Sequence, residues 1–186
     1  MKILFINACV RRQSRTLQLA RHLLKRLEGE VMELNLEEEN ITPLTRETLE
    51  KREHLVREGR LDDTSFQYAR KFAEADCIVI AAPFWDLSFP SLLKIYLENV
   101  AVPGITFQYV EGIPKGMCHA KKLFYVTTAG GPVFADFGYS YVKFLAEHFY
   151  GICETVCFKT ENLDVEGADC SALLQQTEKE MDCYFS

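Results

Sequence analysis

The sequence has no apolar run that approaches the roughly 20 residues needed for a membrane-spanning helix. It also has no excess of basic residues, since 21 Lys and Arg stand against 27 Asp and Glu for a net charge of −6. Such a balance argues against general binding to nucleic acid or to an anionic membrane. The opening residues MKILFINACV have too short an apolar core for a signal peptide, and Arg11-Arg12 follow them. We therefore expect neither a membrane nor a nucleic acid as partner.

A regular set of paired cysteines is lacking as well. The seven cysteines are an odd number without regular spacing, and several stand inside apolar, strand-like runs, as Cys77 and Cys157 do. This pattern favours reduced thiols and a cytoplasmic location over a disulfide framework. Cys118-His119 has no second pair of ligands beside it, so we expect no metal site there.

The chain does contain alternating strand and helix patterns in 186 residues, 48% of which are hydrophobic. That length suits one domain, 1–186, with a sizeable core. Strands are expected at 2–7, 31–36, 77–82, 121–128 and 152–158, and helices at 14–28, from Thr45, and at 62–75, 91–100, 139–149 and 171–185. Residues 101–120 show no clear element, and the charges of 37–63 predict a solvated face. The alternation predicts an α/β fold, a three-layer sandwich around a five-stranded parallel sheet in the order 2-1-3-4-5.

Three loops should meet at the carboxyl edge of this sheet, where ligands of open α/β sheets bind. The first, residues 8–16, runs into a helix N-terminus, which suits a phosphate group, and Ser14-Arg15-Thr16 adds hydroxyl donors and charge. It has neither the lysine of a P-loop nor G-x-G-x-x-G. A helix cap with solvent-facing arginines is the alternative interpretation of this loop.

The other two loops suit a flat ligand. Residues 83–90 place Phe84 and Trp85 just after a buried strand, although these rings could equally be part of the core. Residues 128–134 contain Gly130 and Gly131, which let a backbone approach a ligand closely. Together the loops predict a site for a planar heterocycle that carries a phosphate. No group in them is placed for acid or base chemistry, so we expect no catalytic side chain.

The chain resembles the flavodoxin-like NAD(P)H:quinone oxidoreductases and FMN-dependent azoreductases. The resemblance covers residues 1 to about 150 and rests on Ser14-Arg15-Thr16, on Ala81-Ala82-Pro83-Phe84-Trp85 with Pro90 and Lys94, on Gly104-Ile105-Thr106-Phe107, on Gly116 before Lys121-Lys122, and on Thr127-Thr128-Ala129-Gly130-Gly131. It implies FMN, in preference to FAD, as cofactor, with NADH or NADPH as co-substrate. It also implies a homodimer with sites at the interface and hydride transfer to a quinone, azo compound or similar flat acceptor.

The resemblance assigns a cofactor-binding role to residues of all three loops: Cys9, Ser14, Arg15, Thr16, Pro83, Phe84, Trp85, Asp86, Leu87, Thr128, Ala129, Gly130 and Gly131. Ser14, Arg15 and Thr16 fall where the family holds the flavin phosphate. One departure is Asp86, which stands where azoreductases often have Asn and so brings a negative charge near the flavin. Phe107 or Tyr109 of the partner subunit is expected to help wall the acceptor.

Three functions remain open at this level. An FMN-dependent NAD(P)H oxidoreductase would let nicotinamide and acceptor share one stacked slot, which predicts ping-pong kinetics. A flavodoxin-like electron carrier would bind FMN without nicotinamide activity, although such a shuttle needs no segment like 101–120. A non-flavin α/β domain would use its aromatic residues only as core. The sequence does not identify the physiological acceptor.

Overall fold

The central sheet of the computed structural model, which describes all residues 1–186, has five parallel strands in the order β2-β1-β3-β6-β7. These strands are β1 Lys2–Asn7, β2 Glu30–Asn35, β3 Cys77–Ala81, β6 Lys122–Thr128 and β7 Glu154–Thr160. Because β6 and β7 are the fourth and fifth strands of this sheet, the predicted order 2-1-3-4-5 is confirmed.

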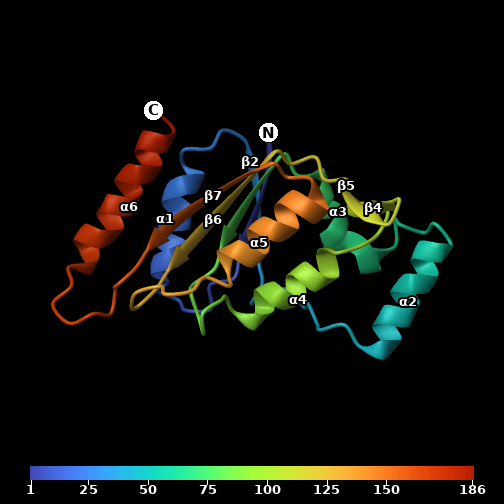
Figure 1. Ribbon diagram of the computed structural model, residues 1–186, viewed down its shortest axis with the longest axis horizontal. Coiled ribbons are helices and arrows are strands. Elements are labelled where there is room, and N and C mark those ends of the chain that lie inside the picture. Colours follow the sequence, from blue (N-terminus) through green and yellow to red (C-terminus); the bar gives the residue numbers. More distant parts are fainter.

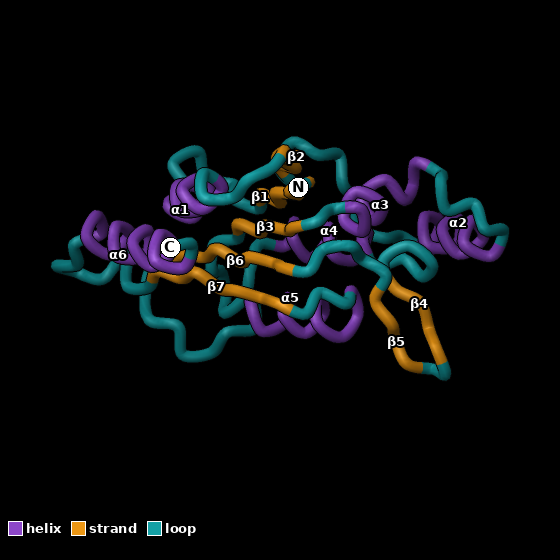
Figure 2. The backbone as a smooth tube through the Cα atoms, turned by 90° about the horizontal axis from the view of Figure 1, so that it is seen from above, coloured by secondary structure: helices purple, strands orange, loops and turns teal.

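Helices cover both faces of the sheet and complete the predicted three layers. They are α1 Arg15–Leu24, α2 Arg46–Arg57, α3 Gln67–Glu74, α4 Ser91–Val100, α5 Tyr139–Leu145 and α6 Cys170–Tyr184. The apolar residues of α3, α4 and α5 pack on one face, and those of α1 and α6 pack on the other. Figures 1 and 2 show α1 and α6 together on one side of the strands and α4 and α5 on the opposite side.

The middle strand β3 explains why both faces need cover. All five of its residues are buried, with Ile78 and Ile80 in the core under α4 and α5, and with Val79 in the core under α1 and α6. Each such side chain contributes about 1.5–3 kcal/mol through burial. A continuous apolar run is what a parallel strand between two helical layers requires.

Residues 101–120, for which no element is expected, form a hairpin of β4 Phe107–Val110 and β5 Ile113–Gly116. Its two-residue turn, Glu111-Gly112, has positive φ at both positions, 53° and 80°, as a type I′ turn demands. Glu-Gly is a weaker hairpin signal than Asn-Gly or Asp-Gly, and each strand has only four residues. For these two reasons the hairpin could not be predicted from the sequence.

The hairpin is attached to the end of α5 by close backbone packing. Gly116 lies so near that a Cβ there would come within 2.1 Å of Gly151 N. Phe107 is buried between Tyr109 and Phe149 of its own chain, with ring centroids 5.4 and 5.6 Å away. The expectation that Phe107 walls the site of a partner subunit is therefore wrong, because its ring already belongs to this core. Tyr109 remains 62% exposed.

Two helix boundaries differ from expectation. α1 ends at Leu24, well before Gly29, because the chain tightens there into i→i+3 hydrogen bonds such as Leu27 N to Leu24 O. The helix expected over 62–75 begins only at Gln67, after a 3₁₀ turn at Thr64–Phe66. Further along the chain, α5 continues as a π turn, Ala146–Tyr150, which Gly151 closes with φ 75°.

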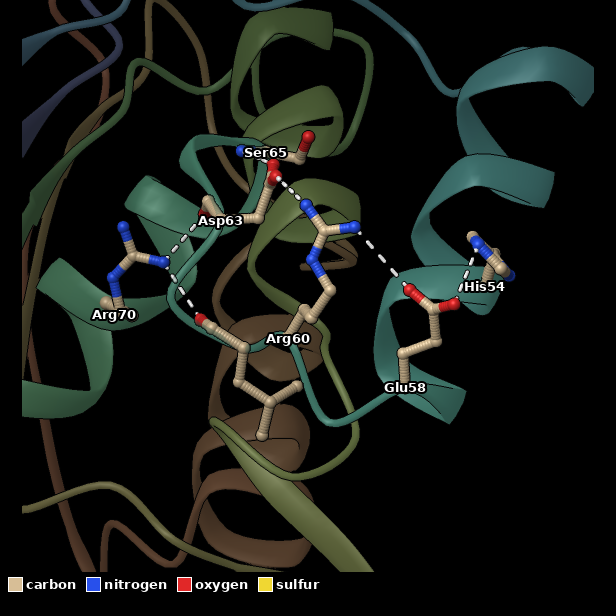
Figure 3. Close-up of polar contacts among 7 residues, drawn as sticks. His54, Glu58, Arg60, Asp63, Ser65 and Arg70 are labelled. Atoms are coloured by element: carbon tan, nitrogen blue, oxygen red, sulfur yellow. Dashed lines mark hydrogen bonds and ion pairs between the residues drawn. The ribbon is translucent and has the colours of Figure 1, made fainter.

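Most charged side chains around the turn between α2 and α3 pair with one another or with nearby backbone, as expected for a solvated face. In Figure 3, Arg60 reaches Glu58 of α2 at 3.5 Å and Asp63 at 3.8 Å. Arg70 of α3 donates to Leu61 O at 2.9 Å and to Asp63 O at 2.7 Å, so it holds the turn that precedes its own helix (Figure 3).

Arg52 is the exception to the predicted solvated face. It is only 8% exposed and donates to Asn99 O at 3.1 Å and Ala101 O at 3.4 Å. These carbonyls lie at the carboxyl end of α4, where the helix dipole favours a cation. Arg52 therefore fastens α2 to the end of α4.

Candidate functional site

The first loop of the site ends at a capped helix. Ser14 has extended backbone angles, and its Oγ accepts the N–H of Leu17 at 3.2 Å, so it is the N-cap of α1. The backbone N–H groups of Arg15 and Thr16 have no hydrogen-bond partner within the protein, as expected for a first helical turn. Two free donors and the positive end of the helix dipole thus meet at one point, which suits a phosphate.

Thr16 and Thr128 join the first loop to the third. Their hydroxyl oxygens lie 2.6 Å apart, and both side chains are buried. One hydroxyl donates to the other, which leaves a single proton for any ligand. The pair therefore fixes the start of α1 against the end of β6, and Thr16 is a less free phosphate donor than its sequence position suggests.

Arg15 is already paired within the protein. Its Nη2 donates to Asp164 Oδ1 at 2.6 Å and its Nη1 donates to Leu163 O at 2.9 Å, and the hydrogen bond to Asp164 raises the pKa of the guanidinium. Sequence reasoning missed Leu163 and Asp164. Their position just after the last parallel strand is the signal that could have found them, because every strand of the sheet ends at this edge.

The second loop supplies the aromatic wall. Phe84 is half-buried and its N–H donates to Thr128 O at 3.0 Å, while the Trp85 side chain is exposed. Trp85 and Ser88 exchange two backbone hydrogen bonds, of 3.0 and 2.8 Å, around a two-residue turn. Asp86 and Leu87 form this turn with φ of 50° and 66°, values that non-glycine residues adopt rarely. Both turn side chains are exposed, and neither lines the pocket described below.

In the third loop, Gly130 is required by the carboxylate of Asp164. A Cβ on Gly130 would lie 2.3 Å from Asp164 Oδ2. The close approach predicted for this glycine is thus made by a side chain of the same protein. Gly131 has open space around it, and Ala129 is buried with its N–H bonded to Thr160 O at 2.9 Å.

Cys9 lies beneath the first loop. It is 6% exposed, and burial raises the pKa of its thiol to about 11. Its backbone N–H donates to Asn7 Oδ1 at 3.0 Å and its Sγ donates to Ala81 O at 3.6 Å. At neutral pH it is therefore a neutral packing residue and not a thiolate nucleophile.

The three loops and the segment after β7 enclose a cavity of about 200 Å³ at the carboxyl edge of the sheet, which is the lower edge in Figure 1. Eight of the expected site residues line it: Ser14, Arg15, Thr16, Pro83, Phe84, Trp85, Thr128 and Gly130. Five do not: Cys9, Asp86, Leu87, Ala129 and Gly131. Val10, Arg11, Gln13, Leu163 and Asp164 line it in addition.

The residues of this cavity fit a flavin mononucleotide. Arg11 forms no ion pair or side-chain hydrogen bond, so the charges of Arg11, Arg15 and Asp164 leave the pocket with a net positive charge. The free N–H groups at the start of α1 provide a place for the phosphate, and Phe84 and Trp85 offer apolar surface for a ring. No group of three or more His, Cys, Asp or Glu side chains is arranged to hold a metal ion. No helix is long and apolar enough to cross a membrane.

Known proteins share both this sequence and this fold. A family model described as "Flavodoxin-like fold" matches residues 1–181. An FMN-dependent NADH:quinone oxidoreductase of Lachnoclostridium phytofermentans is 36% identical over 185 residues, which cover 94% of this chain and 93% of that protein. A second such enzyme, from Clostridium acetobutylicum, is 34% identical over 190 residues, 95% of this chain and 94% of that one.

Solved structures agree on the fold. An FMN-dependent NADH-azoreductase of Bacillus anthracis, solved with FMN, has a TM-score of 0.83 at 19% identity over 100% of this chain and 98% of that one. An azoreductase of the same species reaches 0.80 at 20% identity, with 100% and 98% coverage. From the match over residues 1–181 and the quinone oxidoreductases above 30% identity, the chain belongs to the flavodoxin-like family that includes the FMN-dependent NADH:quinone oxidoreductases.

Proposed function

We propose that the protein is an FMN-dependent NADH oxidoreductase that reduces quinones, azo compounds or similar flat acceptors. The observation that carries this proposal is the pocket itself, in which a helix N-terminus with two free N–H groups stands opposite an aromatic wall. The quinone oxidoreductases to which the chain is similar carry the same activity in their names. When bound, FMN supplies the two-electron chemistry that links NADH oxidation to acceptor reduction.

The chain's own residues would hold and orient the cofactor. The N–H groups of Arg15 and Thr16 would bind the phosphate, and the hydroxyl of Ser14, which accepts from Leu17, keeps its own proton to donate. Arg11 would add an uncompensated positive charge. No side chain is needed as acid or base, and the neutral thiol of Cys9 is in keeping with that.

Phe84 and Trp85 would form one wall of a slot that nicotinamide and acceptor occupy in turn. Trp85 is 37% exposed, so part of its ring is available to a ligand. Asp86 lies at the tip of the adjacent turn, which places a negative charge near the slot and would disfavour anionic acceptors.

We also propose that one domain, 1–186, works as a homodimer in the cytoplasm. Support for the dimer comes from exposed apolar side chains on α5 and the loop before it, such as Phe137, which is 63% exposed, and Phe144, which is 55% exposed. Exposed aromatics that gather on one surface are typical of association sites. Support for the cytoplasm comes from the seven cysteines, all of which are free.

Flavin binding gives the direct test of the cofactor site. Full-length protein freed of flavin should quench FMN fluorescence on titration, and Arg11→Gln should weaken FMN binding roughly three- to tenfold, because an exposed cation near a phosphate contributes modestly. Arg12→Gln is the matched control, because this change removes the same charge at a residue that does not line the cavity. Equal effects of the two variants would contradict the phosphate position.

Turnover separates this enzyme from a flavin-binding electron carrier. Holoprotein should consume NADH when a quinone is added, with reduction of the flavin absorbance before the quinone arrives. Bleaching by chemical reductants but not by NADH would favour the carrier, and colourless protein that binds no FMN would contradict both functions.

A further inference from the structure

Arg15 connects the start of α1 to the loop of residues 161–169, 148 positions along the chain. Its Nη1 donates to Leu163 O and its Nη2 donates to Asp164 Oδ1. These bonds use one hydrogen of Nη1 and one of Nη2. The Nε–H and the second hydrogen of Nη2 have no hydrogen-bond partner in the protein. Because Arg15 lines the cavity, these two donors remain for a ligand.

Asp164 is itself held in place by the third loop. Its backbone N–H donates to Gly130 O at 2.8 Å, and the N–H of Leu163 donates to Ala129 O at 3.2 Å. Its Oδ2 lies against the Cα of Gly130, so closely that any side chain at residue 130 would collide with it. The backbone of the loop and the ion pair with Arg15 thus position the carboxylate, although its side chain is 61% exposed.

We propose that Asp164 is a positioning residue for the phosphate of the flavin. It would hold the Arg15 guanidinium in place before the cofactor binds, with the free Nε and Nη2 edge available to two phosphate oxygens. A guanidinium can pair with a phosphate in this bidentate way, and an arginine that is already ordered loses less conformational entropy on binding. This inference rests on the proposed position of the phosphate at the start of α1.

Charge alone would give Asp164 the opposite effect, since a carboxylate repels a phosphate. Two observations favour positioning over repulsion. The Asp164 charge is compensated by Arg15 at 2.6 Å, and Arg11 keeps the pocket positive overall. A partly exposed ion pair contributes little to folding stability, so the contact matters mainly through where it places the guanidinium.

The test compares FMN with riboflavin, which lacks the phosphate, in fluorescence titrations of full-length protein freed of flavin. Asp164→Ala should weaken FMN binding about tenfold, the loss expected for a hydrogen bond to a charged group, and should change riboflavin binding less than about twofold. Asp164→Asn keeps the shape beside Gly130 and should lose less. Arg15→Gln should resemble Asp164→Ala, and the double variant should be no weaker than Arg15→Gln alone.

Asp169→Ala is the matched control, because Asp169 lies on the same loop and caps α6 through Ala172 N at 3.0 Å without lining the cavity. It should change neither affinity. Equal losses of FMN and riboflavin in Asp164→Ala would overturn the proposal in favour of a purely structural loop, and tighter FMN binding would show repulsion. If Ser14→Ala and Arg15→Gln both leave the ratio of FMN to riboflavin affinity unchanged, the phosphate position itself is wrong.

Discussion

At the scale of single residues, the site depends on side chains that join loops far apart in the chain. Thr16 and Thr128 are separated by 112 positions and share one buried hydrogen bond. Arg15 and Asp164, 149 positions apart, likewise join two loops through an ion pair. The candidate cofactor pocket is thus built from contacts that form only once the whole sheet is assembled, so its shape and the stability of the fold are coupled.

The threonine pair gives a prediction for stability. Thr16→Val removes one hydroxyl and leaves the other buried without a partner, which should lower the free energy of unfolding by about 1–3 kcal/mol. Thr16→Val with Thr128→Val removes both groups and should cost less than the sum of the two single changes. Urea unfolding of the four proteins measures this, and strictly additive losses would contradict a direct hydrogen bond.

Trp85 gives a prediction for kinetics. If its exposed ring walls the slot, Trp85→Ala should raise the KM for a quinone roughly two- to tenfold, the value of one stacked aromatic contact, and Trp85→Phe should retain most of the affinity. Steady-state assays at several NADH and quinone concentrations should give parallel double-reciprocal lines, because both substrates use the slot in turn. Intersecting lines would rule out a shared slot.

At the scale of elements, α1 and α6 are fastened to each other by a three-residue cluster. Asp182 of α6 accepts from His22 and from Arg26, both at 2.7 Å. The hydrogen bond from His22, with further help from Arg26, holds the pKa of the Asp182 carboxyl below its ordinary value. The His22 side chain, only 23% exposed, is about three-quarters buried by this contact with α6.

This cluster predicts a pH dependence of stability. Because the folded-state pKa of Asp182 is lowered, its contribution is present above the unfolded-state pKa of about 3.9 and is lost as pH falls through the folded value. Asp182→Asn should therefore be less stable than wild type near pH 7, and the two proteins should converge as the pH falls below about 4. Urea unfolding at several pH values tests this; a difference that stays constant down to pH ~3 would exclude the carboxylate as its source.

At the scale of the whole molecule, the notable feature is where apolar surface remains uncovered. The apolar helix α4 contributes little to it, because Leu93, Tyr96, Leu97 and Val100 of that helix are buried in this chain's own core. One group of exposed apolar side chains, which includes Phe137 and Phe144, lies on α5 and on the loop before it, next to α4 in Figure 1. A second group, Tyr109, Val110 and Ile113, lies on the β4–β5 hairpin. A second copy of the chain that covered the α5 surface would also flank the cofactor pocket, because Phe137 N donates to Leu87 O of the second loop.

The dimer gives the last prediction. Light scattering at micromolar concentration should show about twice the chain mass of 21.4 kDa. Phe137→Ser with Phe144→Ser should shift the protein toward the monomer, because each removes a large exposed apolar group from the contact. Met32→Ser is the control, since Met32 is 50% exposed on the edge strand β2, away from α5. A wild-type monomer, or equal effects of both variants, would contradict an interface at α5.

The sheet and most helices could be predicted from the sequence because their signals are local. A run such as Cys77 to Ala82 is apolar at every position, and that pattern by itself requires a strand covered on both faces. Ser14, Thr45 and Gly151 act through hydrogen bonds and backbone angles within a few residues, so their roles as helix ends follow from residue type. The alternation of strands and helices then restricts the order of the sheet to very few choices.

Only the tertiary structure decided what each polar side chain binds. Arg15 could face a ligand or a carboxylate, and the fold places Asp164 beside it from the far end of the chain. In the sequence, Arg52 is one of many charged residues in the segment 37–63, which is predicted to be solvated. The fold instead buries it at the end of α4. Such contacts join positions that are distant in the chain, and an ion pair or hydrogen bond depends on separations of about 3 Å that no local pattern encodes.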